Sequence, residues 1–170
     1  NGGWEWRTVP YGNFGDLNLL DVFGTDLVEI RTQGEQVYND PQYGLFGDLN
    51  LVDQNVCFKM KTSEERPEVS GTYLYGGSLG QMEPITLRRG WNWIPNPYVF
   101  RRQQTDCLTG SFVEGDRLVS KDGGFTEYSD NRWTGSLYTL DPGQGYLFYN
   151  AGEAGRTLAY NDEFEMDAQD

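Results

Sequence analysis

The side chains that carry most enzyme chemistry are scarce in this chain of 170 residues. Histidine is absent, and the cysteines number two. Without an imidazole the chain has no Ser-His-Asp or Cys-His nucleophile system, no histidine-ligated zinc and no imidazole acid or base. The 26 acidic side chains could include a carboxylate pair that hydrolyses a glycosidic bond. So many acids also form pairs by chance, and we therefore interpret them as solvated surface charge and predict no catalytic residue.

The two cysteines, Cys57 and Cys107, leave two alternatives open. They can pair in an oxidising compartment or remain small buried apolar residues, and the second alternative is favoured because free cysteine is usually buried. No metal or other cofactor is predicted. Calcium stays an alternative, because the segment Phe-Gly-Asp-Leu-Asn-Leu occurs at 14–19 and again at 46–51. Calcium loops usually bring more oxygen ligands and a later Glu, so a polar turn is the simpler interpretation.

Aromatic rings are the more informative group, with 5 Trp and 11 Tyr. An exposed ring offers the flat apolar C–H face of a sugar a surface to stack on, and neighbouring polar side chains can bind the hydroxyls. Trp133 follows the polar run 129–132 near the end of a predicted hairpin, and Tyr43, its predicted counterpart in repeat 1, follows a similar run at 39–42. Partial burial under a loop is the alternative for Trp133. The predicted ligand-binding residues are Trp133, Tyr128, Tyr43, Tyr73, Tyr75 and Arg132.

The other four tryptophans form two pairs, Trp4 with Trp6 and Trp91 with Trp93. A spacing of two residues puts both members of a pair on the same face of a strand. Because a buried Trp supplies a large packing area, we predict that these four rings belong to the core.

The balance of charge limits the partners. Asp and Glu number 26 against 13 Lys and Arg, giving a net charge of −13 and a pI near 4.3. Nucleic-acid binding relies on a basic face, so no nucleic-acid partner is expected, and an anionic membrane surface is disfavoured for the same reason. No apolar run approaches the ~18 residues of a membrane span, and no signal peptide is recognised in the sequence.

Short runs with period-two alternation, separated by turn residues, predict strands along most of the chain. One or two helical turns are expected at 16–23 and at 101–109, where the strand pattern is interrupted. The predicted strands lie at 28–31, 36–38, 56–60, 71–75, 85–87, 91–94, 117–120, 125–128, 132–134 and 145–149. So many strands with so little helix indicate an all-β, antiparallel chain.

The chain also repeats itself. Gly3-Trp4-Glu5-Trp6 reappears as Gly90-Trp91-Asn92-Trp93, and Gly47-Asp48-Leu49 reappears as Gly135-Ser136-Leu137. We therefore predict a single domain (1–170) made of repeat 1 (3–62), bridging strands (63–89), repeat 2 (90–150) and an acidic C-terminal segment (151–170). The expected fold is an antiparallel β-sandwich or barrel built from two repeats that an approximate twofold axis relates.

The second repeat carries two recognisable motifs. Leu-x-x-Gly-Trp-Asn-Trp-Ile spans 87–94, and Pro-Gly-x-Gly-Tyr spans 142–146. Their order resembles a β-repeat common in secreted multidomain proteins of Bacteroidetes and other polymer-degrading bacteria. The first repeat is diverged, with Gln54 and Asn55 in place of the Pro-Gly pair.

The resemblance implies a secreted, extracellular or cell-surface module that is non-catalytic and sits as a monomer within a larger multidomain protein. Together with the aromatic surplus, it predicts binding of a polysaccharide for an attached enzyme, without metal. The negative charge favours a neutral plant-type polymer of the β-glucan, mannan or xylan type. The alternative is a structural or adhesive spacer of a bacterial cell-surface protein.

Overall fold

The computed structural model of the chain describes residues 4–8, 27–49, 56–63, 83–98 and 100–161. Every strand pairing among these residues is antiparallel, which confirms the predicted all-β class. The described helix is one turn, α2 (Gln104–Cys107), inside the window 101–109 that the sequence marks as helical. The other helical window, 16–23, lies outside the described residues. No helix in the described part of the chain is long and apolar enough to cross a bilayer.

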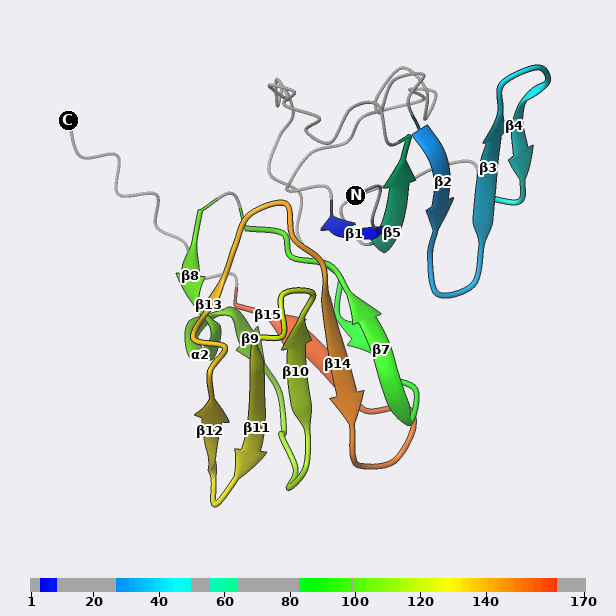
Figure 1. Cartoon of the computed structure of the whole chain (residues 1–170). Coiled ribbons are helices and arrows are strands. Elements are labelled where there is room, and N and C mark those ends of the chain that lie inside the picture. Colours follow the sequence, from blue (N-terminus) through cyan, green and yellow to red (C-terminus); the bar gives the residue numbers. More distant parts are fainter. Residues whose placement is uncertain (1–3, 9–26, 50–55, 64–82, 99, 162–170) are drawn as a thin grey trace.

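The first half of the chain contributes a five-stranded sheet, at the upper right of Figure 1. Its strand order is β1-β5-β2-β3-β4. The strands are β1 (Trp4–Thr8), β2 (Leu27–Arg31), β3 (Gln36–Asp40), β4 (Gly44–Gly47) and β5 (Cys57–Thr62). Its buried core is built by Leu27, Ile30, Val37, Leu49, Phe58 and Met60.

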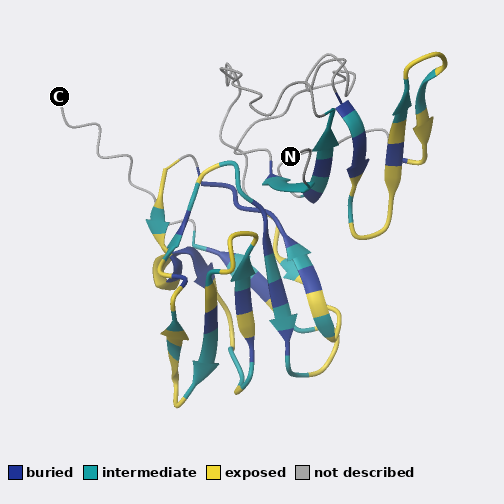
Figure 2. Ribbon diagram, viewed as in Figure 1, coloured by how far each residue is buried: buried dark blue, intermediate teal, exposed yellow. Residues whose placement is uncertain are grey.

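The second half forms another five-stranded sheet and two smaller ones. The large sheet has the order β12-β11-β10-β14-β7, and the small ones are β6-β15-β9 and β13-β8. β15 lies behind β10 and β14 in Figure 1, and Figure 2 shows buried residues along both layers. The strands are β6 (Ile85–Thr86), β7 (Gly90–Ile94), β8 (Arg102–Gln103), β9 (Leu108–Thr109), β10 (Arg117–Ser120), β11 (Phe125–Ser129), β12 (Arg132–Gly135), β13 (Thr139–Leu140), β14 (Tyr146–Asn150) and β15 (Thr157–Tyr160).

The core of the second half lies between these layers. Leu118 and Phe148 come from the large sheet, and Leu158 and Tyr160 come from β15, all in one buried cluster. β15 therefore belongs to this fold, although the sequence assigned residues 151–170 to a separate acidic segment. Alternation of Leu158 and Tyr160 with more exposed neighbours is the period-two pattern of a half-buried strand.

The two large sheets have the same strand order when their strands are matched by the sequence repeat. β1, β2, β3, β4 and β5 correspond to β7, β10, β11, β12 and β14, and the order β1-β5-β2-β3-β4 becomes β7-β14-β10-β11-β12. The matched strands β4 and β12 each end in a glycine with positive φ, Gly47 at 146° and Gly135 at 157°. A Cβ at either position would lie 2.1 Å from a backbone oxygen of the neighbouring strand, so glycine is required at both.

The prediction that Trp4, Trp6, Trp91 and Trp93 belong to the core is wrong. Trp91 is 44% exposed, and the other three rings are half-buried. Each pair does share one face, but on β7 the buried residues are Asn92 and Ile94, which point to the opposite face. The Asn92 side chain is satisfied there by the backbone of Arg88 and Gly90, which explains how a polar residue occupies the core side.

The tryptophans instead help to join the two halves of the molecule. The Lys59 ammonium lies 4.8 Å from the ring centroid of Trp6 and 4.4 Å from that of Trp93, so it makes cation–π contacts with both halves. The Gln33 side-chain amide donates to Trp91 O and accepts from Trp93 N, at 2.8 and 3.0 Å. Gln33 therefore caps the free edge of β7 with the pairing that a further strand would provide.

Candidate functional site

The described residues enclose a pocket of about 290 Å³ beside Trp133. It lies where the end of β12 meets α2 and β13. We call it the Trp133 pocket, and its lining residues are Gln103, Gln104, Thr105, Thr126, Trp133, Gly135, Leu137, Tyr138 and Thr139. None of these nine side chains is charged, in a chain where 23% of residues are Asp, Glu, Lys or Arg. The pocket therefore offers an aromatic ring, hydroxyls and amides to a neutral ligand.

Trp133 is held rigidly at this pocket. It lies on β12 opposite Tyr128 of β11, and the two ring centroids are 5.4 Å apart. Phe112 and Phe148 also meet the Trp133 ring edge-on, with centroids at 5.0 and 6.4 Å. The ring is half-buried and packs against the core of the second half, so the sequence alternative of partial burial describes it better than a fully exposed platform. Such packing fixes the orientation of the part of the ring that lines the pocket.

Gln104 adds a hydrogen-bonding group in the wall of the Trp133 pocket. Its backbone N–H donates to Tyr138 O at 2.8 Å, which ties α2 to the segment that leads into β13. The residue is 2% exposed, and its side-chain Nε2 has no hydrogen-bond partner among the described residues. A buried donor without a partner costs about 1–3 kcal/mol. A ligand oxygen could supply the acceptor that this amide lacks.

Tyr138 stands at the rim of the Trp133 pocket and is 74% exposed. Its neighbours Leu137 and Leu140 are buried, so the backbone around it is anchored while the ring faces solvent. The sequence reasoning missed Tyr138. The pattern Leu137-Tyr138-Thr139-Leu140 could have identified it, because an aromatic residue between two buried leucines projects away from the core.

The other predicted ligand residues fall in different places. Tyr128 and Arg132 lie next to Trp133, on β11 and at the start of β12, but neither lines the Trp133 pocket. Tyr43 lies in the turn between β3 and β4 of the other large sheet, is 69% exposed, and meets Phe46 edge-on with centroids 6.4 Å apart. Leu45, two residues before Gly47, occupies the strand position that Trp133 occupies before Gly135, so the prediction that Tyr43 is the counterpart of Trp133 is wrong. Tyr73 and Tyr75 lie outside the described residues.

Metal ligands do not gather in the described part of the chain. No group of three or more Cys, Asp or Glu side chains there could hold an ion. Asp48, in the second copy of the repeated hexapeptide, accepts a hydrogen bond from Gln36 N at 2.8 Å. It thus ties the start of β3 to the residue that follows β4, while residues 14–19 of the first copy lie outside the described residues.

The thiols and buried phenols are poor nucleophiles. Cys57 and Cys107 are both buried and free, which confirms the alternative that the sequence favours. Burial raises the pKa of each thiol from 9.0 to about 12. Burial also raises the pKa of Tyr146 to about 12, although the N–H of Asp141 that donates to its hydroxyl opposes this shift. At neutral pH these groups are protonated, and a protonated thiol does not attack a substrate.

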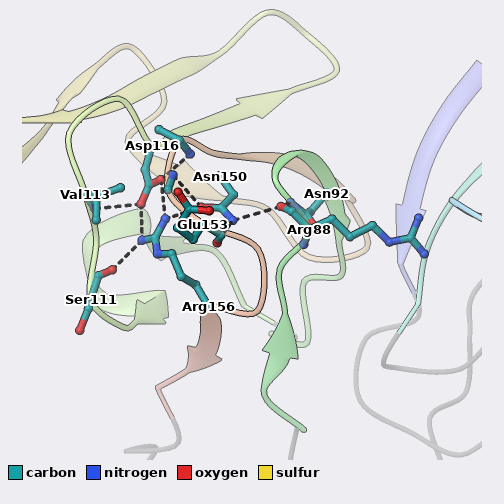
Figure 3. Close-up of polar contacts among 10 residues, drawn as sticks. Arg88, Asn92, Ser111, Val113, Asp116, Asn150, Glu153 and Arg156 are labelled. Carbon is teal, nitrogen blue, oxygen red and sulfur yellow. Dashed lines mark hydrogen bonds and ion pairs between the residues drawn. The ribbon is translucent and has the colours of Figure 1, made fainter.

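Figure 3 shows a cluster of polar side chains around Asp116 and Arg156, apart from the Trp133 pocket, whose hydrogen bonds hold parts of the fold together. Asp116 is fully buried, and the Arg156 guanidinium donates to both of its carboxylate oxygens, at 3.0 and 2.7 Å. Val113 N and Ala151 N donate to the same carboxylate at 3.0 and 2.9 Å. The hydrogen bond to Asp116 raises the pKa of Arg156. Asp116 is thus bonded on both oxygens, and the cluster ties β10 to the loop before β15.

Comparison of the chain with protein-family models, with curated proteins and with solved structures finds no match. Its function therefore has to be inferred from the chemistry of the Trp133 pocket.

Proposed function

We propose that the chain is a non-catalytic carbohydrate-binding module that holds a neutral polysaccharide in the Trp133 pocket. The observation that carries this proposal is the composition of the pocket wall, which combines one indole ring with amides and hydroxyls and has no charged side chain. A ligand of matching chemistry has an apolar face and several hydroxyl groups but no charge. A sugar residue of a β-glucan, mannan or xylan chain meets that description.

Several features support a binding role rather than catalysis. The Trp133 pocket has no carboxylate, thiol or imidazole in its wall, so it lacks the groups that most often act as acid, base or activated nucleophile. The surface around it belongs to a chain with a net charge of −13, which repels anionic polymers. Packing of Trp133 against Phe112 and Phe148 gives a preformed site, as small-ligand pockets usually are.

The proposal extends to the setting of the module. The two sheets of equal strand order support an origin from an internal repeat, and the Gly-Trp-Asn-Trp-Ile and Pro-Gly-x-Gly-Tyr motifs resemble repeats of secreted multidomain proteins. The module would thus act outside the cell or at its surface, as a monomeric part of a larger protein, and would bring an attached enzyme to its polymer.

A spacer or adhesive module is the second candidate. It is favoured by the aromatic cluster at β3 and β4 of the first large sheet, where the exposed Tyr38, Tyr43 and Phe46 lie together and none of them lines the Trp133 pocket. Protein contacts would use such a cluster without any sugar.

Affinity electrophoresis separates these two candidates. The purified chain is run through gels that contain barley β-glucan, glucomannan or xylan, beside a gel without polysaccharide. Retardation in at least one of these gels supports the carbohydrate-binding module. Equal mobility in all of them contradicts it and favours the spacer.

A further inference from the structure

A second hollow lies on the other side of Tyr138 from the Trp133 pocket. Its volume is about 170 Å³, and it lies between the turn that joins β10 to β11 and the loop that leads into β14. We call it the Asp122 hollow. The residues that line it are Ser120, Lys121, Asp122, Ser136, Leu137, Tyr138, Thr139, Asp141, Gln144, Gly145 and Tyr146.

The Trp133 pocket and the Asp122 hollow share one wall. Leu137, Tyr138 and Thr139 line both of them. Leu137 is buried, and the backbone of Tyr138 accepts a hydrogen bond from Gln104 N, so this wall is fixed to the core on one side and to α2 on the other. The exposed Tyr138 ring therefore stands on a ridge between two hollows, where it can contact a ligand that occupies either one.

Three charged residues line the Asp122 hollow; Lys121 and Asp141 form ion pairs with residues outside it, and the Asp122 carboxylate has no ion pair among the described residues. The Lys121 ammonium is 2.6 Å from a carboxylate oxygen of Glu5, and Asp141 is 2.5 Å from the Arg101 guanidinium. Hydroxyl and amide groups of Ser120, Ser136, Thr139 and Gln144 complete the wall. The hollow thus presents hydrogen-bonding groups with little positive charge to attract an anion. Unlike the Trp133 pocket it contains charged side chains, but a carboxylate such as that of Asp122 accepts hydrogen bonds from hydroxyl groups, so the hollow also suits a neutral, hydroxylated ligand.

We propose that the Trp133 pocket and the Asp122 hollow are adjacent subsites that hold neighbouring sugar residues of one neutral chain, with the Tyr138 ring between them. This inference rests on the proposed carbohydrate-binding function. The module would then recognise an internal stretch of polysaccharide rather than a single sugar. Its affinity should rise with the length of the oligosaccharide until both subsites are filled.

Isothermal titration with oligosaccharides of increasing length tests the second subsite. Cello-, manno- and xylo-oligosaccharides from disaccharide to hexasaccharide are titrated into the wild type and into Asp122→Ala and Asp122→Asn. Asp122 is exposed in a turn, so neither change should affect folding. Alanine removes a hydrogen-bonding group, and we expect it to weaken binding of the hexasaccharide about three- to tenfold while leaving the disaccharide unaffected. Asparagine, which keeps an acceptor oxygen, should restore most of the affinity.

The outcomes distinguish the two proposals. Binding that does not change with length, together with equal affinity of Asp122→Ala and the wild type for the hexasaccharide, contradicts the second subsite and leaves the carbohydrate-binding function standing. No binding of any oligosaccharide contradicts both proposals. A length-dependent gain that Asp122→Ala removes supports both.

Discussion

The buried side-chain amide of Gln104 is a group in the wall of the Trp133 pocket whose hydrogen bonding the fold leaves incomplete. Its Nε2 has no partner among the described residues, and in a core this costs free energy of folding. Natural proteins keep such groups at functional sites more often than elsewhere, because a ligand can complete them.

Replacing Gln104 with leucine tests this interpretation. Gln104→Leu removes the unsatisfied donor at similar volume, so the free energy of unfolding should rise by about 1 kcal/mol in urea denaturation. Binding of a neutral oligosaccharide should weaken in the same variant. Gln42→Leu, an exposed position in the turn between β3 and β4, is the matched control and should change stability by less than about 0.5 kcal/mol. A less stable Gln104→Leu protein with unchanged binding would assign the amide a purely structural role.

The buried thiols make stability depend on pH on the alkaline side. The pKa values of Cys57 and Cys107 are raised from 9.0 to about 12 in the folded chain. Above pH 9 the unfolded chain loses thiol protons that the folded chain keeps. This ionisation stabilises the unfolded state and so lowers the free energy of unfolding. The contribution of the thiols is therefore fully present below pH 9 and is lost as the pH rises to about 12.

Thermal unfolding between pH 7 and pH 11 checks this expectation. The melting temperature should fall above pH 9, and it should fall less steeply in a Cys57→Ala, Cys107→Ala double variant. The thiols of the native chain should also resist an alkylating reagent at pH 8. Rapid alkylation of both thiols without unfolding would show that they are accessible and would contradict the burial argument.

At the scale of elements, the sequence predicts strands better than it predicts their faces. Period-two alternation located β7, β10, β11, β12 and β14, and it placed Trp91 and Trp93 on one face. It could not say which face is buried, because Asn92 is polar and its satisfaction by the Arg88 and Gly90 backbone arises only in the folded chain. Trp133 was found from its position at a hairpin end. The pocket beside it could not be predicted, because α2 and β13 are brought close to β12 only by the tertiary fold.

The end of strand β12 depends on the single residue Gly135. The backbone there has φ of 157°, and a Cβ would lie 2.1 Å from Phe125 O, a distance that real Cβ atoms do not reach. Gly135→Ala should therefore lower the free energy of unfolding by several kcal/mol, on the order of 3. Gly34→Ala is the matched control, because nothing lies within 4 Å of its Cβ position, and it should be nearly neutral. Chemical denaturation of both variants measures the difference, and equal stability would contradict the strand end described for β12.

At the scale of the whole molecule, the two halves meet through polar and aromatic contacts rather than a continuous apolar core. The Lys59 ammonium between Trp6 and Trp93 is joined by the Lys121–Glu5 ion pair and by Gln33 on the edge of β7. Exposed ion pairs contribute little. The aromatic contacts of Lys59 therefore act at this junction together with the backbone hydrogen bonds from Thr8 N to Gly143 O and from Gly145 N to Trp6 O.

Lys59→Ala should lower the free energy of unfolding by about 1–2 kcal/mol, because it removes two cation–π contacts in a half-buried setting. Lys59→Arg keeps a cation between the rings and should retain most of the stability. Thermal and urea unfolding of the two variants measures the contrast. The junction would have to rest on other contacts if Lys59→Ala were as stable as the wild type.

The central claim, that the Trp133 pocket binds a neutral polysaccharide, is tested most directly by isothermal titration of the wild type, Trp133→Ala and Tyr43→Ala with the best-retarding polymer. Loss of a stacking ring is worth ~1–3 kcal/mol by analogy with bases, so Trp133→Ala should weaken binding about tenfold or more. Tyr43→Ala, which removes an exposed ring from the other sheet, should bind like the wild type. A chelator and moderate salt should leave the wild-type affinity unchanged. Full affinity in a folded Trp133→Ala protein, or its loss in Tyr43→Ala, would contradict the claim.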